Sequence, residues 1–363
     1  MAANDQAEIY NSSASEESAH LLIIRLSAMG DVAMTVPVIH ALLQKYPNLK
    51  VTVLTRGFFE PMFSSLKQVS VYKADLKGRH KGLIGLWKLY RELVKEQPHF
   101  VADLHNVLRS KLLRFFFSFT SIPLAHIDKG RKEKKALTAA TNKRFEPLKS
   151  THKRYAEVFE ALGFKFQIEG ANFQPPRALS QEVQEISGAH DKRWIGVAPF
   201  AAFRGKMYPM DQMISVIDEL NNTNKYKIFL FGGGSEEIRQ LEPLEQRFDH
   251  VISVAGKLKF TQELELISAL DLMLSMDSGN GHLAAMFGIP TVTMWGVTHP
   301  YAGFYPFGQD PNNALLSNRE QFPLIPTSVY GNKYPEGYDN TMTTIKPEQV
   351  VRKILEVLSQ TAL

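Results

Sequence analysis

The residues with the clearest chemical meaning form a glycine turn, MDSGNGH, at positions 276–282. An apolar run over residues 270–275 precedes it and predicts a buried strand, and the alanine-rich stretch over residues 282–287 predicts a helix. The N–H groups of a helix's first turn have no partner within the helix, and glycine lets a ligand approach the backbone closely. This pattern therefore predicts an anion site suited to a phosphate group.

A second turn of this kind lies near the N-terminus, where SAMGD at residues 27–31 follows the apolar run of residues 21–26. Asp31 would then lie beyond the carboxyl end of a strand, which is the edge where open parallel sheets bind ligands. A carboxylate there could act as a general base if it reaches a substrate hydroxyl. The alternative is an aspartate that caps the N-terminus of the following helix.

Two further turns in the second half of the chain carry charged residues. Lys206 follows the first expected strand of that half, and a lysine there suits a phosphate as a point charge, although it could also be a solvated surface residue. The glycines of residues 232–234 open a helix, and Glu236 or Glu237 could bind ribose hydroxyls or complement the helix dipole. The spacing is not the G-x-G-x-x-G fingerprint, which argues against a nicotinamide cofactor.

The remaining polar candidates admit plainer explanations. Asp277 suits a turn that bonds to backbone N–H groups, and His282 has no partners at metal-ligand spacing. Residues 129–154 hold ten basic and two acidic side chains. Such a charge run is either a solvated surface or, because it is so one-sided, the binding site of an anionic acceptor.

The composition bounds the class of protein. A chain of 363 residues favours two domains, and 44% hydrophobic with 22% charged residues is typical of a globular protein. The absence of cysteine excludes disulfides and thiolate metal sites, and it fits a cytoplasmic protein. A net charge of +5 suits an acidic partner, which could be nucleic acid, anionic lipid or a phosphorylated substrate.

Apolar runs alternate with amphipathic stretches along the chain, which predicts an α/β fold with parallel sheets. We expect two Rossmann-like domains that face each other across a cleft. The expected boundaries are a disordered tail over residues 1–19, an acceptor-binding domain over 20–175, a nucleotide-sugar-binding domain over 176–345, and a final helix over 346–363 that could pack back on the first domain. Residues 301–344 are rich in Pro, Gly, Asn and Tyr, which predicts a long irregular excursion.

Together these segments resemble the ADP-heptose:lipopolysaccharide heptosyltransferases, glycosyltransferase family nine, over roughly residues 21–358. The strongest pieces are RLSAMGDV at 25–32 with TVP after it, and DSGNGHLAA at 277–285 with GIPT after it. WGVTHP at 295–300 resembles the segment that follows in that family. Two motifs in the right order, far apart along the chain, make the resemblance specific.

The resemblance implies a GT-B fold and an inverting transfer in which Asp31 takes the proton of the acceptor hydroxyl. It implies a heptose transferred from ADP-heptose to a phosphorylated lipopolysaccharide core, with no metal and no cofactor. The implied donor-binding residues are Lys206, Glu236, Glu237, Asp277, Ser278, Gly279, Asn280 and His282. The implied acceptor-binding residues are Arg109, Arg131 and Arg154.

Two departures keep the substrates open. Asn280 and Gly281 stand where the family more often has Leu, Pro or Met, and residues 322–333 have no counterpart that we can assign. The alternatives are a transferase of this fold with another nucleotide sugar or acceptor, a nicotinamide oxidoreductase and a nucleic-acid binder. The chain lacks the interleaved aromatic and basic residues of single-strand readers, so we expect no nucleic-acid partner. We expect a cytoplasmic protein that could contact the inner membrane peripherally.

Overall fold

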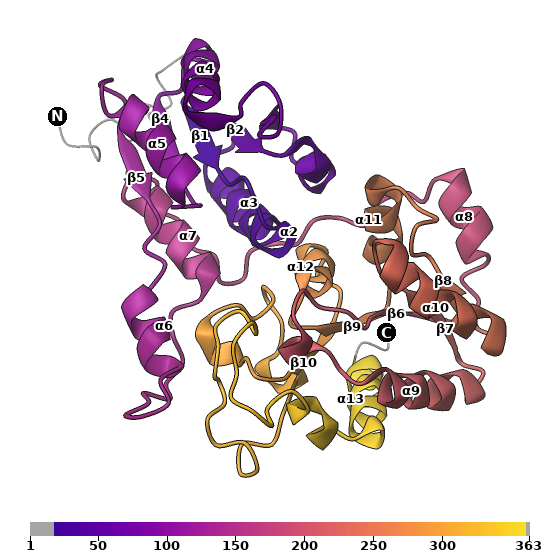
Figure 1. The fold of residues 1–363 in the computed structure, drawn as a ribbon. Helices are drawn as coiled ribbons and strands as arrows, with labels where there is room; N and C mark the ends of the chain where they lie inside the picture. Colours follow the sequence, from indigo (N-terminus) through magenta and orange to yellow (C-terminus); the bar gives the residue numbers. More distant parts are fainter. Residues whose placement is uncertain (1–17, 361–363) are drawn as a thin grey trace. The chain divides into compact units, whose positions relative to one another are not determined.

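The computed structural model describes residues 18–360, which form two compact units (Figure 1). Unit 1 contains the chain up to residue 130 together with residues 150–174, and unit 2 contains residues 131–149 together with the chain from residue 175. The expected boundary near residue 175 did not include the crossing of residues 131–149 into unit 2. Most of the expected tail, residues 1–17, lies outside the described residues.

Unit 1 is built on a five-stranded parallel sheet with the order β3-β2-β1-β4-β5. The chain order reverses beside β1, so the segments that leave β1 and β4 emerge side by side, where open sheets of this kind bind ligands. The strands are β1 (His20–Ile24), β2 (Lys50–Thr55), β3 (Val69–Lys73), β4 (Phe100–Asp103) and β5 (Leu124–His126). The helices are α2 (Met29–Ala33), α3 (Thr35–Lys45), the 3₁₀ helix η1 (Gly57–Phe63), α4 (Gly82–Lys95), α5 (Leu108–Phe117) and α7 (Thr151–Glu160).

Unit 2 has a six-stranded parallel sheet with the order β11-β10-β9-β6-β7-β8, and its chain order reverses between β6 and β9. The strands are β6 (Arg193–Ala198), β7 (Tyr226–Leu230), β8 (Val251–Ser253), β9 (Leu272–Met276), β10 (Thr291–Trp295) and β11 (Ala314–Leu316). The helices are α6 (Arg131–Leu137), α8 (Gln181–Ser187), α9 (Met210–Asn222), α10 (Ser235–Arg247), α11 (Phe260–Ser268), α12 (Gly279–Met286) and α13 (Pro347–Gln360). Short 3₁₀ helices are η2 (Arg204–Lys206), η3 (Pro300–Ala302), η4 (Pro311–Asn313) and η5 (Thr341–Thr344).

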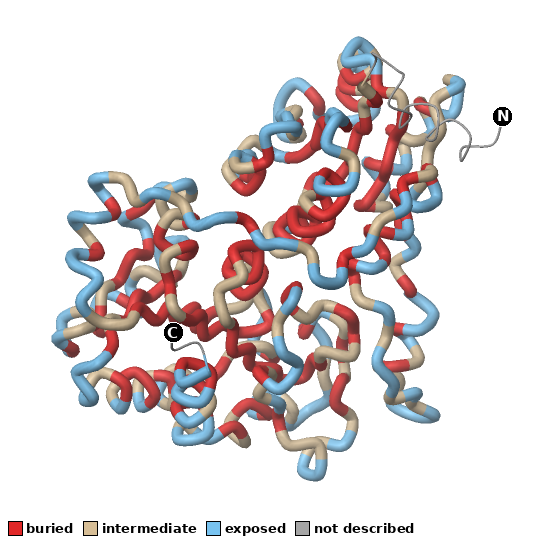
Figure 2. Tube along the Cα trace, turned by 180° about the vertical axis from the view of Figure 1, so that it is seen from behind, coloured by how far each residue is buried: buried red, intermediate tan, exposed pale blue. Residues whose placement is uncertain are grey.

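The central strands are continuous apolar runs because helices cover them on both faces. All five residues of β9 are buried, and so are all five of β10. Figure 2 shows this buried interior within each unit. The α/β class with parallel sheets expected from the sequence is confirmed.

Helix α13 lies in unit 2, where it packs on α9 (Figure 1). Its buried residues Val350, Val351 and Ile354 belong to the same apolar core as the strands of that unit. Its amphipathic spacing supplies the apolar face that packs on α9 within unit 2. The expectation that it could also pack back on the first domain stays a prediction.

Segment 131–149 is tied into unit 2 by contacts with the excursion of residues 301–344. The ammonium group of Lys143 donates to the carbonyl oxygens of Leu324 at 2.9 Å and Pro326 at 2.7 Å. The guanidinium of Arg319 lies 3.4 Å from the ring centroid of Phe145. Burial, followed by the nearby charge of Arg319, lowers the pKa of Lys143 to about 8. Lys143, one of the ten cations of the basic block, thus has a structural role.

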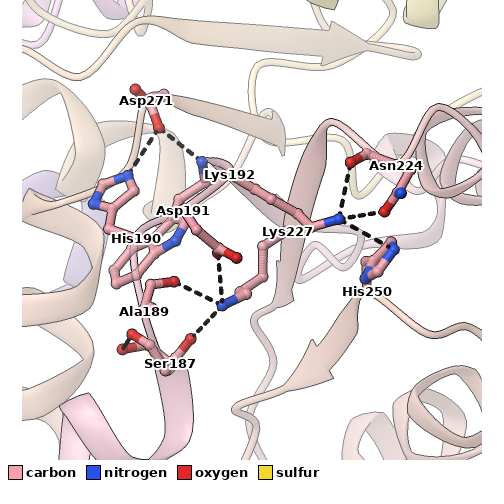
Figure 3. Close-up of polar contacts among 11 residues, drawn as sticks. Ser187, Ala189, His190, Asp191, Lys192, Asn224, Lys227, His250 and Asp271 are labelled. Atoms are coloured by element: carbon pink, nitrogen blue, oxygen red, sulfur yellow. Dashed lines mark hydrogen bonds and ion pairs between the residues drawn. The ribbon is translucent and has the colours of Figure 1, made fainter.

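A polar network holds the chain that enters β6 against the amino-terminal edge of the second sheet (Figure 3). Lys227 donates to the carbonyl oxygens of Ser187 and Ala189, each at 2.9 Å. Lys192 contacts Asn224 and, at 3.3 Å, the Nε2 atom of His250. These two lysines are therefore engaged by the fold, at the edge of the sheet opposite its ligand-binding ends.

Candidate active site

The first cluster of polar residues lies where β1 ends in unit 1. Arg25 follows the strand, is 4% exposed, and places its Nη2 atom 2.6 Å from Oδ2 of Asp31. Its Nη1 atom donates to the carbonyl oxygen of Leu104, which follows β4, at 2.6 Å. The side chain of Arg25 thus joins the two neighbouring strand ends, and the position of Asp31 depends on it.

Asp31 occupies the first turn of α2, whose N-cap residue is Ala28. The Asp31 carboxylate accepts the N–H of Ala28 at 3.3 Å, again through Oδ2. Asp31 is therefore not the N-cap residue of the alternative interpretation, although it does stabilise the start of the helix. Because both recorded contacts of the carboxylate engage Oδ2, Oδ1 is the oxygen that remains to face a ligand.

Tyr155 of α7 contacts both Arg25 and Asp31. Its ring centroid lies 5.8 Å from the Arg25 guanidinium, and its hydroxyl donates to the backbone carbonyl of Asp31 at 3.3 Å. The ring is fully buried, and this burial raises the pKa of the Tyr155 hydroxyl. The phenol stays neutral and fixes the backbone at Asp31.

His105 follows β4 at the same edge of the sheet. The buried carboxylate of Asp103 accepts the N–H of His105 at 2.8 Å and pairs with Arg114 at 3.0 Å, which fixes this loop. Burial lowers the pKa of His105 to about 3, and the charges of Arg25, Lys129 and Arg109 add to the effect. His105 is therefore neutral at ordinary pH and lies in a field of positive charge.

Sequence reasoning missed Arg25, His105 and Tyr155. Arg25 had a usable signal, because a charged residue at the end of an apolar strand needs a partner when it is buried. His105 offered a weaker one, as a titratable residue directly after an expected strand. Tyr155 offered none, because its contact with Asp31 joins residues 124 positions apart.

The three arginines expected to bind an acceptor have different surroundings. Arg109 is exposed at the start of α5, directly after the loop of His105. Arg154 is 3% exposed, and its Nη1 atom donates to the carbonyl oxygen of Asp128 at 3.3 Å. Arg131 is exposed on α6, which belongs to unit 2. Within unit 1, the positive charges of Arg25, Lys129 and Arg109 all act on His105.

The second cluster lies in unit 2, where the chain leaves β6, β9 and β10. Lys206 Nζ is 3.2 Å from Oδ2 of Asp277, and the Thr298 hydroxyl donates to the same oxygen at 2.9 Å. The side chains of Lys206 and Asp277 are 13% and 9% exposed. Asp277 therefore holds a nearly buried ammonium group at the carboxyl edge of the sheet, and the two contacts named here are with side chains rather than with the backbone N–H groups expected from the sequence.

Close backbone packing sets the position of Lys206. The N–H of Val297 donates to the carbonyl oxygen of Gly205 at 2.9 Å. A Cβ atom on Gly296 would lie 2.2 Å from that same oxygen, so a side chain there would force the two turns apart. Gly296 is therefore required for the turn after β10 to meet the turn that carries Lys206.

Helix α12 begins directly after Asp277, with Ser278 as its N-cap residue. No side chain caps its first turn, and the Ser278 hydroxyl lies 3.1 Å from that of Ser275. Gly279 and Asn280 form the first turn, whose N–H groups can therefore bind an anion. His282 is 8% exposed, further along the helix.

The glycine turn after β7 gives Glu236 and Glu237 different surroundings. The Glu237 carboxylate accepts the N–H of Gly233 at 2.7 Å, so it stabilises its own turn. Glu236 is exposed and contacts Arg239 and Gln240, and the hydrogen bond from Gln240 is the main cause of its lowered pKa. Both oxygens of the exposed Glu236 carboxylate are thus engaged by side chains of its own helix, Oε2 by Arg239 and Oε1 by Gln240.

No group of three or more His, Asp or Glu side chains within residues 18–360 is placed to hold a metal ion. None of the helices in that range is long and apolar enough to cross a membrane.

Two parallel α/β units, each with charged residues at the carboxyl edge of its sheet, are characteristic of the GT-B type of fold. Solved structures of that type match nearly the whole chain. A glycosyltransferase family 9 protein from Veillonella parvula has a TM-score of 0.72 at 20% identity, over 96% of this chain and 100% of that one. The E. coli heptosyltransferase WaaC with ADP has a TM-score of 0.63 at 18% identity, over 93% and 99%.

Residues 86–324 match the model of glycosyltransferase family 9 (heptosyltransferase), and the chain belongs to this family. It is 25% identical to the lipooligosaccharide heptosyltransferase 2 of Haemophilus influenzae, over 94% of this chain and 100% of that one. It is 24% identical to the lipopolysaccharide heptosyltransferase 2 of Salmonella typhimurium, over 94% and 99%. The protein is a glycosyltransferase, and the resemblance seen in its motifs is confirmed.

Proposed function

We propose that this enzyme transfers a heptose from ADP-heptose to the phosphorylated inner core of lipopolysaccharide, with inversion at the anomeric carbon. The Asp31 carboxylate takes the proton of the acceptor hydroxyl while the hydroxyl oxygen forms a bond to that carbon. The bond from the carbon to the diphosphate oxygen breaks, and ADP leaves with the electron pair. The observation that carries this proposal is the Asp31 carboxylate, whose Oδ2 is held by Arg25 and Ala28 while Oδ1 remains open.

Unit 2 supplies the donor site in this proposal. The ammonium group of Lys206 and the N–H groups at the start of α12 suit the two phosphates of ADP, and they are in place before the leaving group gains charge. The exposed carboxylate of Glu236 suits ribose hydroxyls. An E. coli relative has been solved with ADP-2-deoxy-2-fluoro heptose, which supports this class of donor.

Unit 1 supplies the acceptor site. Arg109 and Lys129 place positive charge near His105, as the lowered pKa of that histidine reflects. Phosphate groups on an acceptor would be drawn to this charge. Arg154 acts indirectly in this proposal, because it holds the carbonyl of Asp128 beside Lys129. Arg131 remains a candidate for acceptor binding from α6.

The donor is tested by single-turnover transfer to a deep-truncated lipopolysaccharide acceptor, with ADP-heptose, ADP-glucose and UDP-sugars compared at equal concentration. We expect product with ADP-heptose, with the opposite anomeric configuration to the donor by NMR. Faster transfer from a UDP-sugar would overturn the donor and favour the alternative of another nucleotide sugar. Retained configuration would overturn the inverting mechanism.

The acceptor site is tested by charge reversal. Arg109→Glu should raise the acceptor KM and leave the donor KM unchanged, with the larger effect at low salt because exposed attractions are screened. Arg144→Glu is the matched control, since Arg144 is an exposed cation of unit 2 paired with Glu146. Equal changes in both KM values for Arg109→Glu would contradict the assignment.

A further inference from the structure

Helices α4 and α5 of unit 1 expose large apolar side chains that the proposed chemistry does not use. The residues, which we call the apolar face, are Leu83 (60% exposed), Ile84 (84%), Trp87 (48%), Leu108 (74%), Phe115 (56%) and Phe119 (74%). Scattered apolar residues on a surface are ordinary, but five large ones on two adjoining helices, with Phe119 two residues beyond the end of α5, are not.

The apolar face is separate from the core that the same helices build. Leu86, Leu89 and Leu93 of α4 are buried with Leu113 and Phe117 of α5 in the core of unit 1. At 100° per residue, Ile84 falls opposite this core stripe, Trp87 lies roughly 130° from it and Leu83 lies on the flank of the helix, about 90° from it. Both helices are therefore apolar on two sides, and one of these sides faces outward.

The two halves of the apolar face belong to one layer. The ring of Tyr90 on α4 lies 5.6 Å from that of Phe116 and 5.1 Å from that of Phe117 on α5, between ring centroids. Phe115 and Phe119 meet edge-on at 5.0 Å. Phe116 also lies 6.0 Å from Phe115 between ring centroids, so the contact between the two helices reaches the exposed residues at the end of α5.

Positive charge surrounds the apolar face. Between residues 81 and 119 the exposed cations are Lys81, Lys88, Arg91, Lys95, Arg109 and Lys111. Glu96 is the one exposed acid in that range. Glu92 binds the hydroxyl of Tyr72 at 2.6 Å and Arg79 at 3.2 Å. The Arg91 guanidinium lies 5.3 Å from the ring centroid of Trp87, so charge and aromatic surface are interleaved.

We propose that the apolar face docks on the surface of an anionic lipid membrane. Aromatic and aliphatic side chains enter the boundary between headgroups and acyl chains, and the surrounding lysines and arginines attract the negative surface. The charge decides between this partner and a second copy of the chain, since two such cationic faces would repel each other. The docking rests on the proposed function in one respect, because a lipid-linked acceptor gives it a use.

Vesicle binding tests the docking without any substrate. The full-length protein is mixed with vesicles of phosphatidylglycerol and phosphatidylethanolamine, or of phosphatidylcholine alone, and separated by flotation. We expect binding to the anionic vesicles that falls in high salt. The variant Ile84→Ser/Trp87→Ser/Phe119→Ser should lose at least tenfold in partition coefficient. Leu355→Ser, which alters an exposed leucine of α13, is its control and should bind normally.

Charge reversal is a second test of the docking. Lys88→Glu/Arg91→Glu should lose at least tenfold in binding to anionic vesicles, because each cation near such a surface contributes about fivefold. The control with equal change of net charge is Lys225→Glu/Arg352→Glu, at exposed positions of unit 2. Equal losses in the two variants would show that net charge alone drives binding, which would overturn the assigned surface.

Tryptophan fluorescence locates the contact. Of the three tryptophans, Trp194 and Trp295 are each 1% exposed, so Trp87 is the one a lipid can reach. Brominated lipids should quench the wild-type emission and leave that of Trp87→Phe unchanged. Binding without quenching would overturn the proposal, and so would a dimer in solution that the triple variant abolishes.

The docking and the proposed function fail separately. Transfer to a delipidated, soluble acceptor should be normal in the triple variant, because none of its residues is assigned to the reaction. Normal vesicle binding with no transfer to any lipopolysaccharide acceptor would overturn the function and leave the docking in place. Normal transfer with no vesicle binding would overturn the docking and leave the proposed function in place.

Discussion

Asp31→Asn separates a catalytic role from a structural one. The amide keeps the shape of the side chain and can still accept the N–H of Ala28, but it cannot take a proton. A positioned general base contributes about 10²–10⁴ in rate, so single-turnover transfer should fall by that factor. This corresponds to about 3–5 kcal/mol of activation free energy. Affinity for ADP should be unchanged, because the proposed nucleotide contacts lie in unit 2.

The same change has a structural cost that can be worked out separately. Arg25 loses the charge of its partner but keeps its bond to Leu104 and its contact with the Tyr155 ring. Weakening one partner of a buried polar group costs about 1–3 kcal/mol. For a unit of this size, that corresponds to a fall in Tm of roughly 2–12 °C. A protein that is still folded at the assay temperature loses none of its turnover from this cost.

The assay is single-turnover transfer from ADP-heptose, with Tm measured on the same samples. The matched control is Asp75→Asn, because Asp75 is another carboxylate of unit 1 that accepts backbone N–H groups, at 2.9 and 2.8 Å. The control should lower Tm without slowing transfer. Near-normal transfer by folded Asp31→Asn protein would mean that Asp31 is not the base.

Three further predictions follow from the geometry. Lys206→Ala should weaken ADP binding by calorimetry, since a cation facing a diphosphate is lost, and an unchanged Kd would contradict the donor site. Gly296→Ala should destabilise the protein by about 1–3 kcal/mol, because the added Cβ atom would lie 2.2 Å from the Gly205 oxygen. It should also weaken ADP binding, because the turn of Gly205 carries Lys206. A variant with normal Tm and normal ADP affinity would contradict this packing. Burial lowers the pKa of His105 from 6.5 to about 3 in the folded protein. Between pH 6.5 and 3 the unfolded chain therefore binds a proton on this histidine that the folded protein does not, so the free energy of unfolding falls as pH drops below about 6.5. Denaturant unfolding of His105→Gln should show a shallower loss of stability between pH 6.5 and 4 than the wild type, and parallel curves would count against a buried neutral histidine.

The elements that the sequence predicted are those with long buried patterns. Strands β1, β9 and β10 are apolar runs, and each was expected within a residue or two. Strands β3, β5 and β11 were not expected, because each lies at the edge of its sheet and is partly exposed. An edge strand carries no continuous apolar signal, so only its pairing partner defines it.

The apolar spacing over residues 32–45 predicts a single helix, whereas the structure has two helices, α2 and α3, which meet at Met34. Pro37 lies in the first turn of α3, where a missing N–H is tolerated, and it is the local signal for this break. The apolar spacing continues through Met34, so it does not by itself mark the break between the two helices.

In the candidate site, residues next to a turn could be found, and pairings across the sheet could not. Asp31, Lys206 and Asp277 follow strands directly, so the pattern of strand and turn marked them. The contact of Arg25 with Leu104 joins residues 79 positions apart, and no local rule predicts it. The assignment of segment 131–149 to unit 2 depends in the same way on partners far along the chain.

The contacts of Lys143 affect how the protein is made. Its partner Pro326 follows it by 183 residues. At a synthesis rate of about 5–20 residues per second, the ribosome needs roughly 10–40 s to supply that partner. During this interval Phe145 also lacks Arg319, so the segment leaves the ribosome without the surface on which it will pack. Nascent chains paused before residue 320 should therefore expose residues 131–149 to proteases and chaperones, even where the sheet of unit 1 has already formed.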